Sequence, residues 1–506
     1  MNPDNPMIRP RLSLMMFLQF FLWASWYVPI SGYMNGVLGF SGAQIGWIYA
    51  TTAIGAILSP MFVGFVADRY FATERILAAL HLVGGICLLL ASQATGFGWL
   101  MFLLVVNALC FMPTLALVNS LSFRNIDDPD RFSRIAVFGT IGWIVSGLLV
   151  DFALGGAMTG WFFYMAGGGG LAMAAYSLTL PHTPPKDTAA AGGDVLGLRA
   201  LSLLKDQSFL IFAVCAFLIS IPLSFYFTWG NAFLTETDRP KPTALMTLAQ
   251  VSEIVVMIVM PWFIGRIGLK NVLVVGMAAW AIRYVLFATL SFPLIILGLL
   301  LHGFCYCFVF VASFIYVSKK APPEISASAQ SLVALLMWGV GMFVGTQVSG
   351  ITGGVYGPPV TIAAAKGEAV SPGQVLPPWV ATEAVKVAAE AVEGEEKRVG
   401  QVGIAPAIGR ADANDVTIER AKQKLPEGGL TIGGFTYAKA DLMAALEKAD
   451  TDESGAVTRT EWQAARSHNW PPIWFWPGLL AAVVCLVFVA GGSDVSRPEE
   501  AAATPG

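Results

Sequence analysis

An amide and a carboxylate stand three residues apart in the middle of an apolar segment. Gln250 and Glu253 lie within residues 244–265, which are otherwise mostly apolar, and their spacing places them on one face of a helix. Ionisable groups are costly in hydrocarbon and commonly mark the path of a substrate or an ion. Burial also favours the protonated form of a carboxyl group. Glu253 is therefore a candidate to load and release a proton, and the alternative is a hydrogen-bonded packing element.

Two further pairs combine a polar group with an aromatic ring. His302 and Tyr306 are four residues apart, as are Gln19 and Trp23, so each pair shares a helix face. A hydrogen-bonding group beside a flat ring suits a planar, polar solute. The alternatives are an interhelical hydrogen bond for His302 and packing or an interfacial position for Trp23. Arg283 is assigned to packing or to snorkelling toward the membrane surface.

A second kind of chemistry is predicted for residues 450–461. Their sequence, DTDESGAVTRTE, matches an EF-hand calcium loop at positions one, three, five, six, seven, nine and twelve. A single loop predicts weak affinity, on the order of 10⁻⁴–10⁻³ M, and the alternative is an acidic loop that binds no metal. Ca²⁺ is the expected cofactor, and no organic cofactor is expected. The predicted ligands are Asp450, Asp452, Ser454, Ala456, Thr458 and Glu461, with Gly455 at the sharp turn.

The elements that carry the first group of residues are predicted to be membrane-spanning helices. Hydrophobic residues make up 56% of the chain and charged residues 12%, whereas a soluble domain has about 25% charged residues. The net charge of −3 gives no reason to expect a nucleic-acid partner. A spanning helix needs about 20 mainly apolar residues. Twelve such segments are predicted: 13–34, 42–66, 76–95, 98–121, 135–154, 159–180, 208–230, 244–265, 271–291, 294–317, 328–350 and 473–492.

The predicted fold is an all-α membrane protein with twelve helices in two six-helix halves. A polar stretch separates the halves, and a small helical insertion, with the calcium loop and a further helix near 375–396, interrupts the second half. Two such halves are the usual arrangement of major facilitator transporters. The expected parts are an N-terminal bundle (1–180), a central cytoplasmic loop (181–207), spans seven to eleven (208–350), an extracytoplasmic insertion (351–472), span twelve (473–492) and a cytoplasmic tail (493–506).

Charges in the short loops predict the orientation in the membrane. Lys and Arg occupy alternate loops, and basic loops stay cytoplasmic. Both termini should therefore be cytoplasmic in an inner (plasma) membrane. The loop with Gly64, Asp68, Arg69 and Arg75 is similar to the cytoplasmic gate signature of the major facilitator superfamily, in which an aspartate can latch onto a helix N-terminus. The alternative is a charged loop that only sets topology.

Several short motifs together resemble the nucleoside:proton symporter family within that superfamily. They are Phe17-Leu-Gln19-Phe, Trp23-Ala-Ser-Trp26, Met112-Pro-Thr-Leu, Gly139-Thr-Ile-Gly142, Leu180-Pro-His-Thr183, Gln250-Val-Ser-Glu253 and Ser328-Ala-Gln330. The resemblance implies nucleoside uptake with protons. It also implies a pocket formed by Thr140, Trp143, Ser224, Phe227, Gln250, Glu253, His302 and Tyr306.

Three positions depart from the family pattern. Ala136 and Ser326 stand where the family tends to have arginine, and Cys307 stands where it commonly has aspartate. Glu253 is thus the chief remaining carboxyl candidate for proton coupling.

The functional prediction is a proton-coupled symporter of nucleosides or related small polar solutes. The alternatives are an uncoupled or differently coupled metabolite transporter or exporter, and a calcium-responsive membrane sensor without net transport. The expected partners are the solute, protons and the lipid bilayer, and a monomer suffices for transport. The aqueous loops carry no set of residues for catalysis, so no enzyme is expected.

Overall fold

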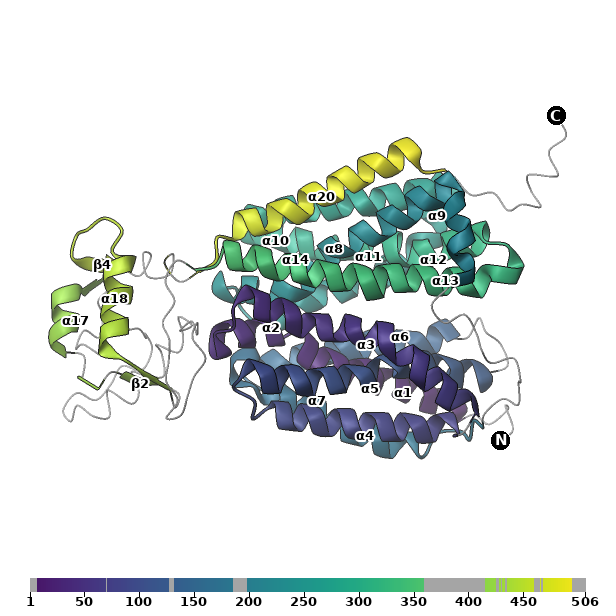
Figure 1. Ribbon diagram of the computed structural model, residues 1–506, viewed down its shortest axis with the longest axis horizontal. Helices are drawn as coiled ribbons and strands as arrows, with labels where there is room; N and C mark the ends of the chain where they lie inside the picture. Colours follow the sequence, from purple (N-terminus) through teal and green to yellow (C-terminus); the bar gives the residue numbers. More distant parts are fainter. Residues whose placement is uncertain are drawn as a thin grey trace.

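The computed structural model describes residues 7–69, 71–126, 132–184, 198–358, 415–424, 427–428, 430–432, 435–458, 465 and 467–493. Nine helical stretches of this described chain are long and apolar enough to cross a membrane. Figure 1 shows them in two bundles, with the N-terminal half in purple and blue and the C-terminal half in teal, green and yellow. The chain is therefore a helical multi-pass membrane protein, as its apolar segments predict.

The N-terminal half is built from apolar helices that pack in pairs. α1 packs along α6 and α7, and α5 packs between α3 and α4. The elements are α1 (Ile8–Tyr27), α2 (Ile30–Tyr33), the π-helix η1 (Met34–Leu38), α3 (Gly42–Arg69), α4 (Thr73–Ala91), α5 (Phe97–Arg124), α6 (Phe132–Phe152), the 3₁₀-helix η3 (Ala157–Thr159) and α7 (Trp161–Ser177).

The C-terminal half is less regular. It contains η4 (Leu198–Lys205), α8 (Gln207–Glu236), α9 (Pro242–Ala288), α10 (Phe292–Leu300), α11 (His302–Tyr306), the π-helix η5 (Cys307–Val311), α12 (Ala312–Lys320), η6 (Pro323–Ile325), α13 (Ser326–Ala334), the π-helix η7 (Leu335–Gly341), α14 (Met342–Val355) and α20 (Trp470–Gly491). α9 bends sharply at Gly268, whose φ of 79° and ψ of 160° suit glycine. This bend falls between the predicted spans 244–265 and 271–291. Two of the π-helical segments lie beside residues of the central cavity described below, and such segments often occur at functional sites.

The two halves approach each other closely near the insertion. Gly42 and Gly46 of α3 lie against Gly350 and Gly353 of α14, and a Cβ atom built at Gly42 would fall 2.4 Å from the carbonyl oxygen of Gly350. Small residues let backbones of membrane helices approach in this way. Asp151 of α6 adds polar contacts across the halves, because its Oδ2 accepts from the Ala244 N–H at 2.7 Å and its carbonyl accepts from Lys241 Nζ at 2.8 Å.

The insertion is not purely helical, which corrects the prediction. Its described part contains β1 (Asp415–Thr417), α17 (Ile418–Lys424), β2 (Leu430–Ile432), β3 (Phe435–Tyr437), α18 (Lys439–Ala449) and β4 (Ala456–Thr458). β1 pairs with β4 and β2 with β3, both antiparallel. The flanking helices reach beyond the predicted limits, since α14 ends at Val355 and α20 begins at Trp470. The helix predicted near 375–396 lies outside the described residues.

Candidate functional site

A cavity of about 510 Å³ lies between the two halves. Its volume falls within the range of small-molecule sites, about 300–1,000 Å³. Both halves contribute to its wall, which combines aromatic rings with a few polar groups. The lining residues are Phe20, Trp23, Tyr27, Thr52, Ala56, Met112, Leu115, Asn119, Ala136, Thr140, Trp143, Phe227, Gln250, Glu253, His302, Tyr306, Trp338 and Met342.

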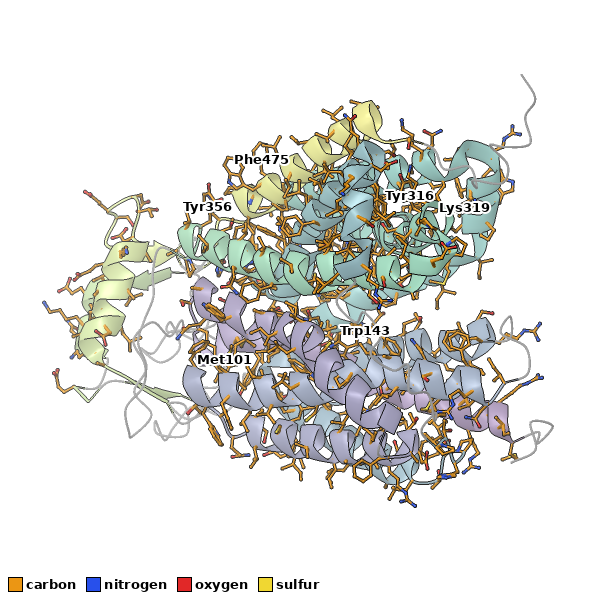
Figure 2. The ribbon with its side chains drawn as sticks, turned by 45° about the vertical axis from the view of Figure 1, so that its right-hand side comes forward. Met101, Trp143, Tyr316, Lys319, Tyr356 and Phe475 are labelled. Carbon is orange, nitrogen blue, oxygen red and sulfur yellow. The ribbon has the colours of Figure 1, made fainter. Side chains whose placement is uncertain are left out.

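The wall from the N-terminal half carries four aromatic side chains, Phe20, Trp23, Tyr27 and Trp143. Trp23 of α1 meets Trp143 of α6 edge to face, with ring centroids 5.4 Å apart, and Figure 2 shows Trp143 between the two bundles. Tyr27, one turn after Trp23, reaches Phe227 of α8 in the other half at 5.3 Å. Thr140 lies one turn before Trp143 and also lines the cavity. This wall offers ring faces and edges on which a planar solute can stack.

The wall from the C-terminal half carries the carboxyl and imidazole groups of the cavity. Gln250 and Glu253 of α9 both line the cavity, as their spacing of three residues predicts for a shared face. Gln250 is buried and Glu253 is half-buried. Tyr306 of α11 lines the same wall and lies 6.1 Å from Trp338 of η7. A carboxyl and a carboxamide group therefore line the cavity together with two aromatic rings.

His302 connects the cavity wall to a buried arginine. Its Nδ1 lies 2.6 Å from Nη1 of Arg283 in α9, and both side chains are buried. The Arg283 guanidinium stacks on Tyr226, with Cζ 3.9 Å from the ring centroid. Snorkelling of Arg283 is thus excluded, because its charged end points into the C-terminal half and is fully shielded from solvent.

Two predicted pocket residues lie outside the cavity lining. Gln19 is fully buried, and its amide donates from Nε2 to Thr114 Oγ1 at 2.7 Å while its Oε1 lies 2.9 Å from His81 Nε2. Ser224 is also fully buried and donates its hydroxyl to the Ser220 carbonyl at 3.0 Å. Both polar groups are used inside a bundle.

Sequence reasoning missed several polar and aromatic residues of the wall. Tyr27, Thr52, Asn119 and Trp338 line the cavity. Tyr27 carried a usable signal, because it lies four residues after Trp23 and so shares its face. Asn119 carried another, as an amide in the long apolar helix α5. Thr52 and Trp338 are indistinguishable from packing residues by sequence alone.

The departures from the family pattern fall at or near the cavity. Ala136 lines it. Cys307 is buried, and its thiol donates to the backbone carbonyl of Glu253 with a sulfur–oxygen distance of 3.6 Å. Ser326 begins α13 away from the lining residues. Of the four predicted gate residues, Arg75 is exposed in α4, and the side chains of Gly64, Asp68 and Arg69 lie outside the described residues.

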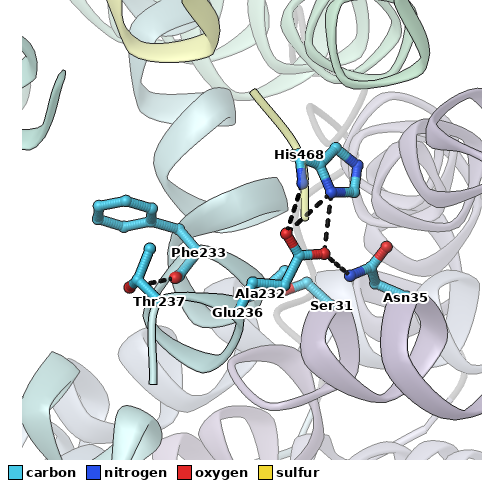
Figure 3. A network of polar contacts seen from close by, with 7 residues as sticks. All are labelled: Ser31, Asn35, Ala232, Phe233, Glu236, Thr237 and His468. Atoms are coloured by element: carbon cyan, nitrogen blue, oxygen red, sulfur yellow. Dashed lines mark hydrogen bonds and ion pairs between the residues drawn. The ribbon is translucent and has the colours of Figure 1, made fainter. Parts of the chain in front are cut away.

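A buried polar cluster at the insertion end joins three parts of the chain (Figure 3). Glu236 at the end of α8 accepts hydrogen bonds from the backbone N–H of His468 at 2.9 Å and from Asn35 Nδ2 at 2.5 Å. The Nδ1 atom of His468 lies 2.9 and 3.1 Å from the two carboxylate oxygens. Asn35 belongs to the N-terminal half and His468 to the segment that leads from the insertion into α20. This cluster holds the halves together at that end.

The first half of the segment predicted to bind calcium forms a turn closed by two aspartates. Asp450 accepts from the backbone N–H groups of Ser454 (3.0 Å) and Gly455 (2.8 Å), and Asp452 accepts from Ser454 N–H at 3.1 Å. Gly455 has a φ of 74°, which suits glycine at a sharp turn. Ala456 and Thr458 follow in β4, and Glu461 lies outside the described residues. Two carboxylates are thus held in one turn, and their hard oxygen atoms are the type that Ca²⁺ prefers.

Known proteins resemble this chain over most of its helical part. Residues 7–359 match the family model described as Nucleoside H+ symporter. The chain is 42% identical to YegT of Escherichia coli over 355 residues, which cover 67% of this chain and 83% of that protein. It is 34% identical to the xanthosine permease of Escherichia coli over 366 residues, covering 68% and 87% of the two chains. The crystal structure of the nucleoside transporter NupG matches with a TM-score of 0.64 at 29% identity, over 70% of this chain and 92% of that one.

Proposed function

Since the chain belongs to the nucleoside H+ symporter family, we propose that it carries nucleosides or closely related solutes across the membrane together with protons. The observation that carries this proposal is the position of Glu253. Its carboxyl group is on the wall of a cavity between the halves, and Trp23 and Trp143 are on the wall from the other half. A carboxyl group in such surroundings can bind a proton when a solute enters and release it when access changes.

The cavity residues bind different parts of the solute, according to the chemistry of their side chains. The rings of Trp23 and Trp143 stack on the base. Gln250 offers both a donor and an acceptor to ribose hydroxyls or base edges, and Glu253 binds the proton. His302 and Tyr306 complete the polar wall of the C-terminal half.

Transport follows the alternating-access scheme of two halves that rock about a central site. We propose twelve spans of the major facilitator type. Two of them belong to α9, one before Gly268 and one after it. Both termini are cytoplasmic in the inner membrane and the insertion is extracytoplasmic. The contacts of Asp151 and Glu236 close the insertion end, so the state described here is closed toward the outside.

The direct test is accumulation of labelled uridine in vesicles that carry an inside-negative potential or an inward proton gradient. Wild-type protein should concentrate uridine when the outside is acidic, and Glu253→Gln should abolish accumulation while allowing exchange of uridine across the membrane. Glu324→Gln is the matched control, because Glu324 is exposed in η6. Accumulation that survives in Glu253→Gln contradicts the proton role. If uridine uptake by wild-type protein is the same with and without the proton gradient, an uncoupled transporter is favoured. If there is no uptake, a sensor is favoured.

We further propose that residues 450–461 bind Ca²⁺ at the outer surface. The convergence of Asp450 and Asp452 on the backbone amide of Ser454 supports this proposal. Titration of Ca²⁺ into the full-length protein in detergent should show one site, and Asp450→Asn should weaken it at least tenfold. Glu453→Gln is the matched control, because it removes one loop charge at a position that supplies no EF-hand ligand. Equal affinity in both variants contradicts the assignment.

A further inference from the structure

Arg283 occupies an unusual place for a cation. Its side chain is fully buried in the C-terminal half, and the guanidinium carbon lies 5.3 Å from the Trp280 ring centroid and 5.1 Å from that of Phe287, in addition to the closer Tyr226. Burial of a charge without compensation is expensive. The aromatic faces offset part of that cost, and the hydrogen bond to His302 directs one N–H group of the guanidinium toward the cavity wall.

The chemistry of arginine determines which nitrogen of His302 carries the proton. A guanidinium has five N–H donors and no acceptor. At 2.6 Å from Nη1, the Nδ1 atom of His302 must therefore accept the hydrogen bond. An imidazolium would set two N–H groups and two positive charges against each other. The imidazole is consequently neutral, and its hydrogen is on Nε2.

The same contacts fix the orientation of the ring. The Tyr226 ring lies 5.0 Å from the His302 ring, and Tyr306 stacks on it at 5.8 Å with an interplanar angle of 28°. Because Nδ1 is engaged by Arg283, the polar atom that His302 can offer to a solute in the cavity is Nε2–H. That atom can only donate.

We propose that Arg283 is a positioning residue that makes His302 an obligate hydrogen-bond donor to the transported solute, so that the solute meets it with an acceptor such as a carbonyl oxygen of the base. The inference rests on the proposed nucleoside function and adds to it a selection between base types. A site that donates to an acceptor leaves its polar group unpaired when the solute brings an amino group instead. Oxo bases are therefore preferred to amino bases at this position.

The tautomer is measurable in the wild-type protein without any substitution. The chain has four histidines, so ¹⁵N-histidine NMR spectra of the full-length protein in detergent can be assigned with His302→Gln as the difference spectrum. The expected signature of His302 is a neutral ring protonated at Nε2 near neutral pH. A ring protonated at Nδ1, or at both nitrogens, overturns the proposal. This readout does not depend on transport, so it remains decisive if nucleosides are not the substrate.

The selectivity is tested with uridine and cytidine, which differ by a carbonyl oxygen and an amino group. Wild-type protein should bind uridine about tenfold more tightly than cytidine. Arg283→Met should bring this ratio close to one, because a released His302 can exchange tautomers and accept from the amino group, while Arg266→Met, an exposed arginine of the same helix, should leave it unchanged. An unchanged ratio in Arg283→Met overturns the proposal.

A folding defect is recognised separately. If Arg283→Met lacks a cooperative melting transition, His302→Gln serves instead, because Arg283 would bind the amide oxygen and leave the NH2 group to donate. The preference for uridine should then be retained, and a ratio close to one overturns the proposal. Absence of binding of either nucleoside to wild-type protein, together with the Nε2–H signature, rejects the proposed function and leaves the positioning of His302 by Arg283 intact.

Discussion

Each half of the molecule contains a buried histidine in a polar network, and the two networks are used differently. In the N-terminal half, His81 of α4 lies against the Gln19 amide, which donates in turn to Thr114. Thr114 donates to the Phe111 carbonyl at 2.5 Å. In the C-terminal half, His302 accepts from Arg283. The Gln19 oxygen can only accept, so His81 carries its hydrogen on Nε2. The Arg283 guanidinium can only donate to Nδ1, so His302 carries its hydrogen on Nε2 as well.

The difference lies in where that hydrogen points. The Nε2–H of His81 is consumed by Gln19 inside the bundle, so this network is neutral and closed. In the proposal above, the Nε2–H of His302 is left for the cavity, and the charge that fixes it, that of Arg283, is buried. A closed polar network stabilises a bundle and sets its packing. A network that leaves one N–H donor unpaired at a cavity wall can use that donor to bind a solute.

The largest expected effect separates the two histidines by stability. His302→Leu leaves a buried guanidinium without its acceptor, which should cost on the order of 3 kcal/mol or more of unfolding free energy. His81→Leu leaves one neutral amide oxygen unpaired and should cost about 1–3 kcal/mol. Thermal melting of both variants in the same detergent shows which substitution costs more unfolding free energy. Equal losses, or a larger loss for His81→Leu, would break the comparison.

The next prediction separates two glutamines by function. Gln250→Leu should weaken uridine binding at least tenfold and change the melting temperature little, because Gln250 is on the cavity wall. Gln19→Leu should lower the unfolding free energy by about 1–3 kcal/mol, because it unpairs Thr114 and His81, and leave uridine affinity within about twofold of wild type. Binding and melting curves on the same preparations test both statements. A strong loss of affinity in Gln19→Leu would restore Gln19 to the binding site.

The sequence predicts the membrane helices and part of the site for physical reasons that can be stated. Hydrocarbon requires long apolar segments, and it makes a carboxylate such as Glu253 stand out. Gln19 shows where this reasoning ends. Four residues turn a helix by about 40° beyond a full turn, so Trp23 can reach the cavity while Gln19 faces α4 and α5. The direction in which Gln19 points depends on how those helices pack, which the sequence of α1 does not contain.

Contacts between distant segments could not be predicted. Arg283 and His302 are nineteen residues apart, and no periodic pattern relates them. The strands of the insertion have three residues each, and β4 exists because it pairs with β1, which precedes it by about forty positions in the chain. Such short strands have no signal of their own in a local window.

A smaller effect is expected where the two halves are joined. Asn35→Ala removes one hydrogen bond to the Glu236 carboxylate, worth about 1.5 kcal/mol, and should shift the population away from closure at the insertion end. Spin labels at Gly96 and Gly354 report it, because both positions are exposed, have room for a side chain and belong to different halves. Their distance distribution should broaden toward longer values. Asn125→Ala is the control, since Asn125 bonds within the N-terminal half, and an equal response to both changes would contradict the role of the cluster.

The smallest expected effect concerns the first helix of each half. Asp206 caps α8, because its Oδ1 accepts from the Phe209 N–H at 2.8 Å. Met7 at the corresponding position of α1 has no side-chain oxygen to accept such a bond. The hydrogen bond from Phe209 first, and then Lys320 at 3.1 Å, lower the pKa of Asp206 below its ordinary value. A lowered pKa means that the stabilisation is present above about pH 4 and is lost as the pH falls through the folded-state pKa. Asp206→Ala should therefore cost about 1 kcal/mol at pH 7, and the melting temperatures of variant and wild type should converge toward pH 3. A difference that persists undiminished at pH 3 would assign the effect to packing and not to the charged cap.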